Sequence, residues 1–213
     1  MCPHHHEKRP RLFRVLRPLV LASKSPRREE LLARLGLTFE IHPAGVDEPP
    51  PSGEPPAEYT LSLARLKAQA VASRFPKKAI LAADTVVVCE GKILGKPRHR
   101  AEAQEMLRLL SGNRHEVITA YVILAGSQKR ERAVRSKVFF KELAPEEIEA
   151  YLETGEPFDK AGAYAIQGIA SYMVREVRGS VTGVIGLPLA EVVEDLLNLG
   201  IITFAGGPHE GQR

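Results

Sequence analysis

The sequence predicts an α/β protein in which helices flank a central mixed sheet and a cleft divides the fold into two lobes. Three observations support this fold class. Residues 19–22 and 80–89 are short apolar runs of the kind that forms buried strands. Residues 58–75 carry apolar side chains at helical spacing. Strand-like and helix-like segments occur in both halves of the chain, without an internal repeat.

The first half of the chain contains predicted strands and helices in mixed order. The predicted strands are 19–22, 39–44, 80–89 and 93–94, and the predicted helices are 29–37, 58–75 and 100–110. Glu90 and Gly91 predict a tight hairpin between the last two strands. Five prolines between Asp47 and Ala57 exclude regular structure there, so this stretch is a predicted loop. Gly112 follows the last helix as a stop signal.

The second half opens with two strand-like runs joined by a polar turn. The runs are 115–124 and 133–140. A helix with acidic residues in its first turn is predicted over 145–154, followed by a loop over 155–168. A strand over 172–177 and a helix over 188–199, which begins with a proline, complete the predicted domain.

Basic charge is concentrated at the N-terminus. The isoelectric point is about 9.1. Residues 1–17 carry five of the 30 Lys and Arg residues but one of the 26 Asp and Glu residues, so the rest of the chain is neutral. We therefore predict a disordered basic extension over residues 1–17, a single folded domain over 18–204 and a disordered tail over 205–213.

Composition also limits the partners of the protein. A neutral body without tryptophan offers neither a basic face nor a stacking platform, so no nucleic-acid partner is expected. Uninterrupted apolar runs stay shorter than the roughly 18 residues of a membrane span, so no membrane partner is expected. The two cysteines, Cys2 and Cys89, form neither a disulfide framework nor a metal pattern. These features predict a cytoplasmic protein.

The turn between the first strand and helix carries an unusual set of charges. Ser25 is a suitable N-cap and Pro26 suits the first helical position. Arg27 and Arg28 then lie in the first turn, where the helix dipole disfavours cations. A phosphate bound at this helix start, with Ser23 among its ligands, would compensate them. The alternative is that both arginines bend back to neighbouring acids or to solvent, and the segment alone does not separate the two.

Two charged residues lie where the pattern calls for apolar ones. Asp84 is the only charge in the strand-like run, and a buried unpaired carboxylate is costly. It is expected to face a polar cleft or a cation, or else to accept backbone hydrogen bonds beside Thr85 at a strand end. Lys67 lies in the middle of the apolar arc of its helix. It either snorkels to water or meets a buried anion.

Two loops present further polar groups. Lys96 stands between Gly95 and Pro97, where the constrained backbone could aim an ammonium group at a phosphate. The loop from 158 to 168 alternates small residues with Asp159, Lys160 and Gln167, which lets a ligand approach the backbone closely. A plain turn with a surface Asp–Lys pair is the alternative for this loop.

Several common catalytic motifs are missing from the sequence. Residues 91–97 do not match a P-loop, because their glycines are too close together and Pro97 replaces the magnesium-binding hydroxyl. Dinucleotide-binding and serine hydrolase signatures are also lacking. His42, His99 and His115 have no metal-ligand spacing, so we interpret them as surface or packing residues.

Eight segments taken together resemble, in order and spacing, the Maf family of nucleoside triphosphate pyrophosphatases. The resemblance runs from about Leu19 to Leu199. The segments are 22–28 (ASKSPRR), Glu48, 67–68 (KA), 83–85 (ADT), 95–97 (GKP), 110–112 (LSG), 159–164 (DKAGAY) and 185–188 (IGLP).

The resemblance implies a two-lobed fold shared with the inosine triphosphatase group, also described as Maf/Ham1-like. It also implies hydrolysis of a nucleoside triphosphate to the monophosphate and pyrophosphate, with Mg²⁺ or Mn²⁺ as cofactor. By similarity, Asp84 would be the general base and would bind the metal with Glu48. The expected substrate-binding residues are Ser23, Arg27, Arg28, Lys67, Lys96, Thr85, Gln167, Asp159 and Lys160.

Within the family, the branch that acts on dTTP and UTP is similar to this chain at Arg27, Thr85 and Gln167. Two departures from the family pattern, Ala165 and Gly183, bear on fine substrate preference. Modified pyrimidine nucleotides such as 5-methyl-UTP are an alternative substrate class. A non-catalytic nucleotide-binding regulator of septum formation and cell-division arrest is the alternative function. The family also implies a homodimer.

Overall fold

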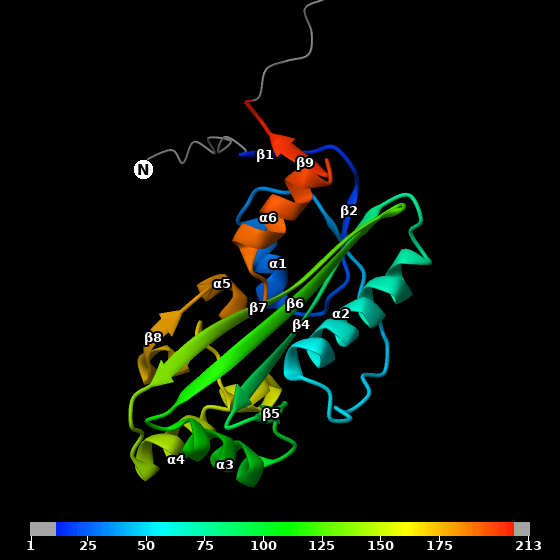
Figure 1. Ribbon diagram of the computed structural model, residues 1–213. Helices are drawn as coiled ribbons and strands as arrows, with labels where there is room; N and C mark the ends of the chain where they lie inside the picture. Colours follow the sequence, from blue (N-terminus) through cyan, green and yellow to red (C-terminus); the bar gives the residue numbers. More distant parts are fainter. Residues whose placement is uncertain (1–11, 207–213) are drawn as a thin grey trace, which may run out of the picture.

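A long strand, β4 (Ala79–Cys89), lies at the centre of a seven-stranded mixed sheet in the computed structural model, which describes residues 12–206 (Figure 1). The strand order is β3-β2-β4-β6-β7-β8, and β5 pairs with the far end of β4. The other strands of this sheet are β2 (Leu19–Leu21), β3 (Glu40–Ile41), β5 (Lys92–Leu94), β6 (Arg114–Ala125), β7 (Gln128–Phe140) and β8 (Val174–Arg178).

Helices cover both faces of this sheet (Figure 1). They are α1 (Pro26–Ala33), α2 (Pro56–Ala72), α3 (Arg100–Leu110), α4 (Pro145–Glu153), α5 (Val181–Ile185) and α6 (Leu189–Asn198). Short 3-10 turns, η1 (Glu156–Asp159), η2 (Ala161–Ala163) and η3 (Ile169–Met173), follow α4. A mixed sheet flanked by helices confirms the predicted fold class.

The direction of pairing changes along the sheet. β2 pairs in parallel with both β3 and β4, whereas β4, β6, β7 and β8 pair antiparallel in succession. β6 and β7 form a long hairpin at the expected place, but its turn is shorter than expected, because β7 begins at Gln128 and not at Ala133. The sheet is therefore parallel where α1 and α2 connect its strands and antiparallel from β4 to β8, where a tight turn joins only β6 to β7.

The apolar character of β4 follows from burial on both faces. Leu81 packs with α1 and α6, whereas Ile80 packs with α2 on the opposite face. Successive side chains of a strand point to opposite faces, so a strand covered on both sides needs apolar residues at consecutive positions. Asp84 interrupts this pattern between Ala82 and Val86, both of which pack with α2.

The molecule has a second apolar cluster at the other end of the long strands. Leu107 and Leu110 of α3 pack there with Ile148 and Leu152 of α4 and with Val87 of β4. The long strands β4, β6 and β7 contribute side chains to both clusters, and Figure 1 shows these strands side by side along the molecule. The cluster around α1 and α6 and the cluster around α3 and α4 form the cores of the two predicted lobes.

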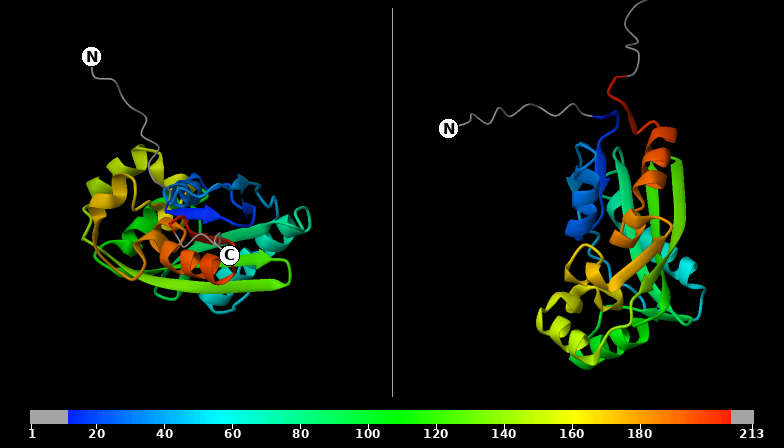
Figure 2. Two further views of the ribbon diagram at one scale, coloured as in Figure 1. Left: turned by 90° about the horizontal axis from the view of Figure 1, so that it is seen from above. Right: turned by 90° about the vertical axis from the view of Figure 1, so that its left-hand side faces the viewer.

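The predicted N-terminal boundary is wrong. Phe13–Val15 forms a strand, β1, paired antiparallel with β9 (Ile202–Phe204), and Phe13 is 5% exposed in the core. Both ends of the described chain therefore lie at one end of the molecule (Figure 2). Phe13 and Val15 alternate with the basic Arg14, as expected for a strand, but the many basic residues of this segment favoured an interpretation as a disordered extension. The predictions of disorder over residues 1–11 and 207–213 concern residues outside the described range.

Other differences concern short elements. The strand expected over 39–44 is reduced to β3, because Pro43 and Gly45 follow it closely. The helix α5 and the strand β9 were not expected, since each is too short to show a period. The loop expected over 155–168 contains the turns η1 and η2, and most remaining element bounds agree with the expectations within a few residues.

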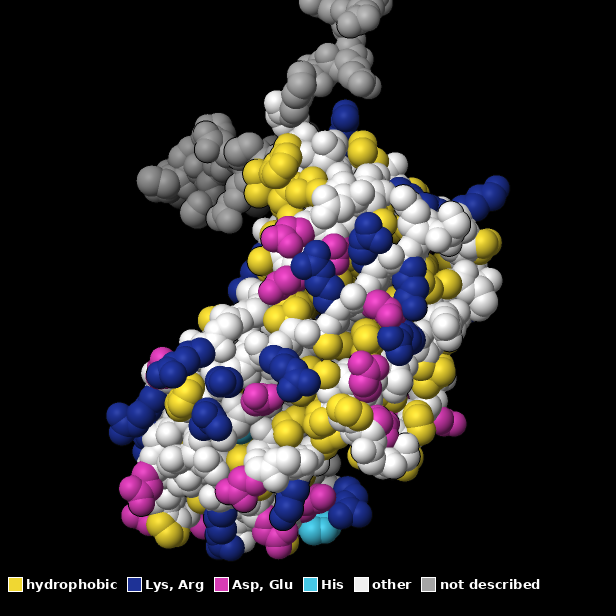
Figure 3. All heavy atoms as spheres, viewed as in Figure 1, with side chains coloured by type: hydrophobic (Ala, Val, Ile, Leu, Met, Phe, Trp, Pro, Cys, Tyr) yellow, Lys and Arg dark blue, Asp and Glu magenta, His cyan; other side chains and the backbone are white. Residues whose placement is uncertain are grey.

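The edge strand β8 is short and carries exposed charged side chains, among them Arg175, Glu176 and Arg178. Lys and Arg side chains gather over β7 and β8 in Figure 3, with acidic groups close by. Charges on an edge strand oppose pairing with another chain. Within residues 12–206, none of the helices is long and apolar enough to cross a bilayer.

Candidate active site

A cleft of about 1060 Å³ lies between the two lobes and collects the polar residues singled out above. Its wall is formed by the turn after β2, the proline-rich loop, one face of α2, the middle of β4, and the loops after β5 and η1. The predicted site residues that line it are Ser23, Arg27, Arg28, Glu48, Lys67, Asp84, Thr85, Lys96, Asp159, Lys160 and Gln167. The structure thus brings the whole predicted set together, while the role of each stays a prediction.

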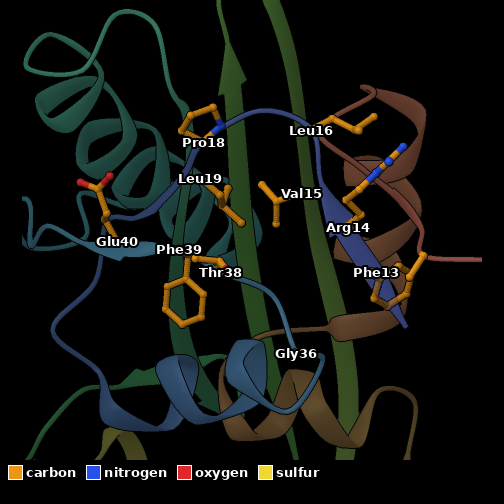
Figure 4. Close-up of a pocket in the computed structure, with 11 residues that line it drawn as sticks. Phe13, Arg14, Val15, Leu16, Pro18, Leu19, Gly36, Thr38, Phe39 and Glu40 are labelled. Carbon is orange, nitrogen blue, oxygen red and sulfur yellow. The ribbon is translucent and has the colours of Figure 1, made fainter. Parts of the chain in front are cut away.

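A second hollow, of about 690 Å³, lies beside β1 and β2 (Figure 4). Its lining is mostly apolar, with Phe13, Val15, Leu19 and Phe39 among the side chains, and it contains none of the predicted site residues. Binding sites for small polar substrates combine a concave surface with convergent polar groups. The interlobe cleft has both features, so it is the candidate active site.

Arg28 is held by three hydrogen bonds from its guanidinium group. Nε donates to the carbonyl of Gly186 at 2.8 Å, Nη1 to Oγ of Ser23 at 3.2 Å and Nη2 to Oγ1 of Thr85 at 3.0 Å. The side chain therefore turns into the cleft, and not to its neighbouring acids. Burial lowers the pKa of Arg28, and the negative charge of Asp84 opposes that effect. An arginine stays charged under such conditions.

A chain of hydroxyl groups continues from Arg28 into the core. Thr119 donates a hydrogen bond of 2.7 Å to the carbonyl of Gly183. Its only hydroxyl proton is then used, so Thr119 accepts from Thr85 at 2.9 Å. Sequence reasoning missed Thr119, although a lone hydroxyl in the apolar run from Val117 to Ala120 was a usable signal.

Asp84 lies at the base of the cleft and is 7% exposed. Its Oδ1 accepts a hydrogen bond from Nζ of Lys67, which also lies 2.8 Å from Oε1 of Glu48. Burial raises the pKa of Asp84, and the charges of Lys67 and Arg28 partly offset this effect. Lys67 thus points to a buried carboxylate and does not snorkel to water.

The cation of Lys67 marks the point where Glu48 and Asp84 converge. Among the described residues, no group of three or more His, Cys, Asp or Glu side chains could hold a metal ion. Two carboxylates are nevertheless a suitable donor set for Mg²⁺, which usually takes one or two carboxylates together with waters and substrate phosphates. The pair of carboxylates fits the predicted metal on these grounds.

Arg27 differs from Arg28 in its surroundings. No hydrogen bond or ion pair of the Arg27 side chain is found within the described part of the chain, although the residue lines the cleft. Across the cleft, the hydrogen bond from Lys160 lowers the pKa of Asp159, and the charge of Arg27 adds to that effect. Arg27 and Asp159 therefore influence each other electrostatically.

Two loops of the lobe that contains α3 and α4, the lower lobe in Figure 1, are joined beside the cleft. The N–H of Gly162 donates a hydrogen bond of 3.0 Å to the carbonyl of Gly95, next to Lys96. Gly162 has φ of 69°, and a Cβ there would come within 3.0 Å of Val87. Glycine is therefore required at this contact. Lys96 and the loop from 159 to 167 are held on the same side of the cleft.

His42, His99 and His115 are surface or packing residues, as predicted, and His99 in addition caps a helix. Nδ1 of His99 accepts the N–H of Glu102 at the start of α3. His42 packs on Phe75, with ring centroids 4.3 Å apart. His115 is 2% exposed, and its Nε2 lies 2.7 Å from the hydroxyl of Tyr164. Ser25 occupies the expected N-cap position of α1, without a side-chain cap hydrogen bond.

Comparison with known proteins identifies relatives over most of the chain. A dTTP/UTP pyrophosphatase of Syntrophus aciditrophicus is 47% identical over 194 residues, which cover 90% of this chain and 95% of that protein. A dTTP/UTP pyrophosphatase of Geobacter sulfurreducens is 52% identical, covering 86% of this chain and 97% of that protein. One from Anaeromyxobacter dehalogenans is 53% identical, covering 85% and 94%.

Among solved structures, a HAM1 protein from Coxiella burnetii aligns with a TM-score of 0.40 and 16% identity, covering 59% of this chain and 73% of that chain. The fold class stated above comes from the structure of the present chain. The family model for Maf-like proteins matches residues 18–199. The chain therefore belongs to the Maf-like protein family.

Proposed function

We propose that this protein hydrolyses dTTP and UTP to the nucleoside monophosphate and pyrophosphate. The names of the relatives support this substrate class. The observation that carries the proposal is the buried carboxylate of Asp84, which lies in a cleft lined by the cationic side chains of Lys67, Arg28 and Lys96. A triphosphate needs several cations, and its hydrolysis needs a base close to the reacting phosphorus.

The cations have hydrogen-bond donors left for phosphate oxygens. A guanidinium group has five N–H donors, and Arg28 uses three of them within the protein. The remaining two make no hydrogen bond within the described part of the chain, and the side chain lines the cleft. The ammonium of Lys67 has three N–H donors, of which Asp84 and Glu48 take two. Arg28, Lys67 and Lys96 would therefore neutralise the triphosphate.

Asp84 would accept the proton of the attacking water. The water oxygen bonds to the α-phosphorus while the bond from that phosphorus to the bridging oxygen breaks, and pyrophosphate leaves with the electron pair. A raised pKa makes a carboxylate a stronger base, provided that it is ionised at the working pH. Burial raises the pKa of Asp84, whereas Lys67 and Arg28 favour the ionised form.

Glu48 and Asp84 would hold Mg²⁺ or Mn²⁺ together with phosphate oxygens. When bound, such an ion lowers the pKa of a coordinated water and neutralises charge that develops on the phosphates. Lys67 links the two carboxylates and keeps them facing each other. Both donors would thus be in position before substrate arrives.

Recognition of the pyrimidine base is assigned to Arg27, Thr85 and Gln167. The Thr85 hydroxyl donates to Thr119 and accepts from Arg28, which leaves one lone pair. Any contact of Thr85 with substrate is therefore as an acceptor. Gln167 is exposed at the mouth of the cleft, and its amide offers both a donor and an acceptor to a base edge.

The test is release of pyrophosphate from UTP, dTTP, 5-methyl-UTP, CTP and GTP in the presence of Mg²⁺ or Mn²⁺. Hydrolysis of the first two, with about a 10²- to 10⁴-fold loss of kcat in Asp84→Asn, is the expected result. Nucleotide binding by Asp84→Asn, measured without metal, is expected to persist. Full turnover by that variant would remove Asp84 as the base. Binding by the unmodified protein without hydrolysis in either metal would favour a regulatory role instead.

A homodimer, a cytoplasmic location and a lack of nucleic-acid and membrane partners stay predictions from sequence. Sedimentation of the purified protein would test the first of them. Mixtures with nucleic acid or vesicles in the same experiment would test the last.

A further inference from the structure

Glu156 connects the two ends of the loop that lines the lower side of the cleft. Its Oε2 accepts the N–H of Ile169 at 2.9 Å, and its Oε1 accepts the N–H of Ala170 at 3.3 Å. The hydroxyl of Tyr151, on α4, donates to Oε1 at 2.8 Å. One carboxylate thus joins the start of the loop, its end and a helix of the lower lobe.

Gly168 leaves the space that this carboxylate occupies. A Cβ at position 168 would lie 2.2 Å from Oε2 of Glu156. The φ angle of Gly168 is −101°, a value that any residue adopts. A side chain at position 168 would therefore have to displace the carboxylate, whereas the backbone conformation itself does not demand glycine.

The loop closed by Glu156 carries three of the expected substrate-binding residues, namely Asp159, Lys160 and Gln167. Its middle is held separately, by the hydrogen bond from Gly162 to the carbonyl of Gly95. Gln167 lies beyond this middle contact, directly before Gly168, and no hydrogen bond of its side chain is found in the described part of the chain. The position of Gln167 therefore depends on the backbone that Glu156 holds.

We propose that Glu156 is a positioning residue that places Gln167 for recognition of the substrate base. The inference rests on the function proposed above, because it assigns base recognition to Gln167. Glu156 does not line the cleft, so it acts through the loop and not by contact with substrate. The side chains proposed to neutralise the triphosphate, Arg28 on α1, Lys67 on α2 and Lys96 after β5, belong to other elements and make no hydrogen bond to Glu156.

The ionised carboxylate is the chemical form that the site requires. Burial alone would raise the pKa of Glu156, but the N–H groups of Ile169 and Ala170 and the Tyr151 hydroxyl lower it overall. A glutamine at this position has one acceptor oxygen, and its NH₂ group would face a backbone N–H. The Glu156→Gln variant keeps the shape of the side chain while removing one of the two acceptors.

The first experiment compares wild type with Glu156→Gln and with the matched control Glu153→Gln. Glu153, at the end of α4, pairs with Arg100 at 2.7 Å, and its side chain is 72% exposed. We expect Glu156→Gln to raise KM for UTP roughly tenfold at similar kcat, which is the signature of lost binding. Discrimination of UTP from CTP should fall by a similar factor. Inhibition by tripolyphosphate, which has no base, should not change, and the control should behave as wild type.

The second experiment is a double-mutant cycle. In the wild-type background, Gly168→Ala displaces the carboxylate, so it should raise KM as Glu156→Gln does. In the Glu156→Ala background the space is free, so the same substitution should have little further effect. Effects that simply add would overturn the direct relationship between Gly168 and Glu156.

Hydrogen exchange of the amides of Ile169 and Ala170 provides a readout that is independent of activity. Both amides should exchange roughly tenfold faster in Glu156→Gln, the factor given by about 1.4 kcal/mol. Unchanged exchange and an unchanged KM would overturn the proposal. If wild type hydrolyses no nucleotide, the proposed function fails, and the exchange data still decide whether Glu156 anchors the loop. A loss of kcat and tripolyphosphate binding together with KM would show a general structural role and reject the positioning role.

Discussion

Lys67, on α2, donates a hydrogen bond from Nζ to Oδ1 of Asp84, on β4. The two side chains come from elements on different layers of the fold and meet at the base of the cleft. Each explains the other, since a lysine on an apolar helix face and an aspartate within an apolar strand are both costly alone. The pair is also the part of the site whose charge controls the proposed general base.

Replacing Lys67 by methionine should move the acid limb of the pH profile of kcat to higher pH. Asp84 must be ionised to accept a proton, and Lys67 is the largest influence that lowers its pKa against burial. Without that cation the pKa of Asp84 rises further, so activity is lost at a higher pH as acid is added. The measurement is kcat for saturating UTP from acid to neutral pH.

Lys78→Met is the matched control for that profile. Lys78 pairs with Glu40 at 2.6 Å on another surface, and it does not line the cleft. Its removal should leave the acid limb in place. If the acid limb of the kcat profile does not move in Lys67→Met, a group other than Asp84 controls it.

Arg28→Lys should destabilise the protein by about 2 kcal/mol and raise KM for UTP. Lysine keeps the charge but cannot form the three hydrogen bonds to Ser23, Thr85 and Gly186 at the same time. Urea unfolding and steady-state kinetics measure the two effects. Arg27→Lys should change the free energy of unfolding by less than about 0.5 kcal/mol, as expected for a side chain without such bonds. Equal losses in both variants would contradict the assigned role of Arg28.

Asp195→Asn should destabilise the protein by about 3 kcal/mol at neutral pH. The Asp195 side chain is 1% exposed and accepts from Arg132 Nη2 at 2.6 Å and from the Tyr121 hydroxyl at 2.6 Å. Burial raises the pKa of Asp195, but these two partners lower it overall below the ordinary value of 3.8. The stabilisation is therefore present above that value and is lost as pH falls through the lower pKa of the folded state.

The difference in unfolding free energy between wild type and Asp195→Asn should accordingly narrow in strong acid. Urea titrations at neutral and acid pH measure it. Glu194→Gln serves as control, because the Glu194 side chain is 62% exposed and lies 3.5 Å from Arg132. If the difference in unfolding free energy between wild type and Asp195→Asn increases in acid, the pKa of Asp195 is raised, contrary to the expectation.

Phe13→Ala should destabilise the protein by about 3 kcal/mol, although the residue lies in the segment expected to be disordered. Phe13 is 5% exposed, and its ring lies 5.4 Å from that of Phe204. Leu12→Ala, at a side chain that is 59% exposed, should have an effect below about 0.5 kcal/mol. Thermal unfolding of the two variants measures the difference. If the two variants are equally stable, Phe13 does not contribute to the core, and the folded domain begins at residue 18 as expected from the sequence.

Much of the fold could be predicted because its long elements repeat a simple pattern. The helix α3 and the strand β4 have the expected bounds within a residue, since each buries one stripe or both faces over many positions. Asp84 and Lys67 were identified for the converse reason, as charges that break such a pattern. The roles of the remaining site residues came from the resemblance to a family and not from periodicity.

Short elements and long-range contacts could not be predicted in this way. β1 and β9 have three residues each and are stable because they pair with one another across almost the whole chain. The roles of Thr119 and Glu156 depend on the carbonyl of Gly183 and on the N–H groups of residues 169 and 170. Nothing in the local sequence reports such partners.

The amino-acid pattern was sufficient for the fold class, for most helices and strands, and for the family to which the chain belongs. The folded structure decided which atoms of the cleft touch one another: that Arg28 holds Ser23 and Thr85, and that Lys67 joins Asp84 to Glu48. The physical reason is the range of the interactions. Burial of apolar surface acts on every turn of a helix and every second residue of a strand, whereas a hydrogen bond or ion pair depends on two groups that only the finished packing brings together.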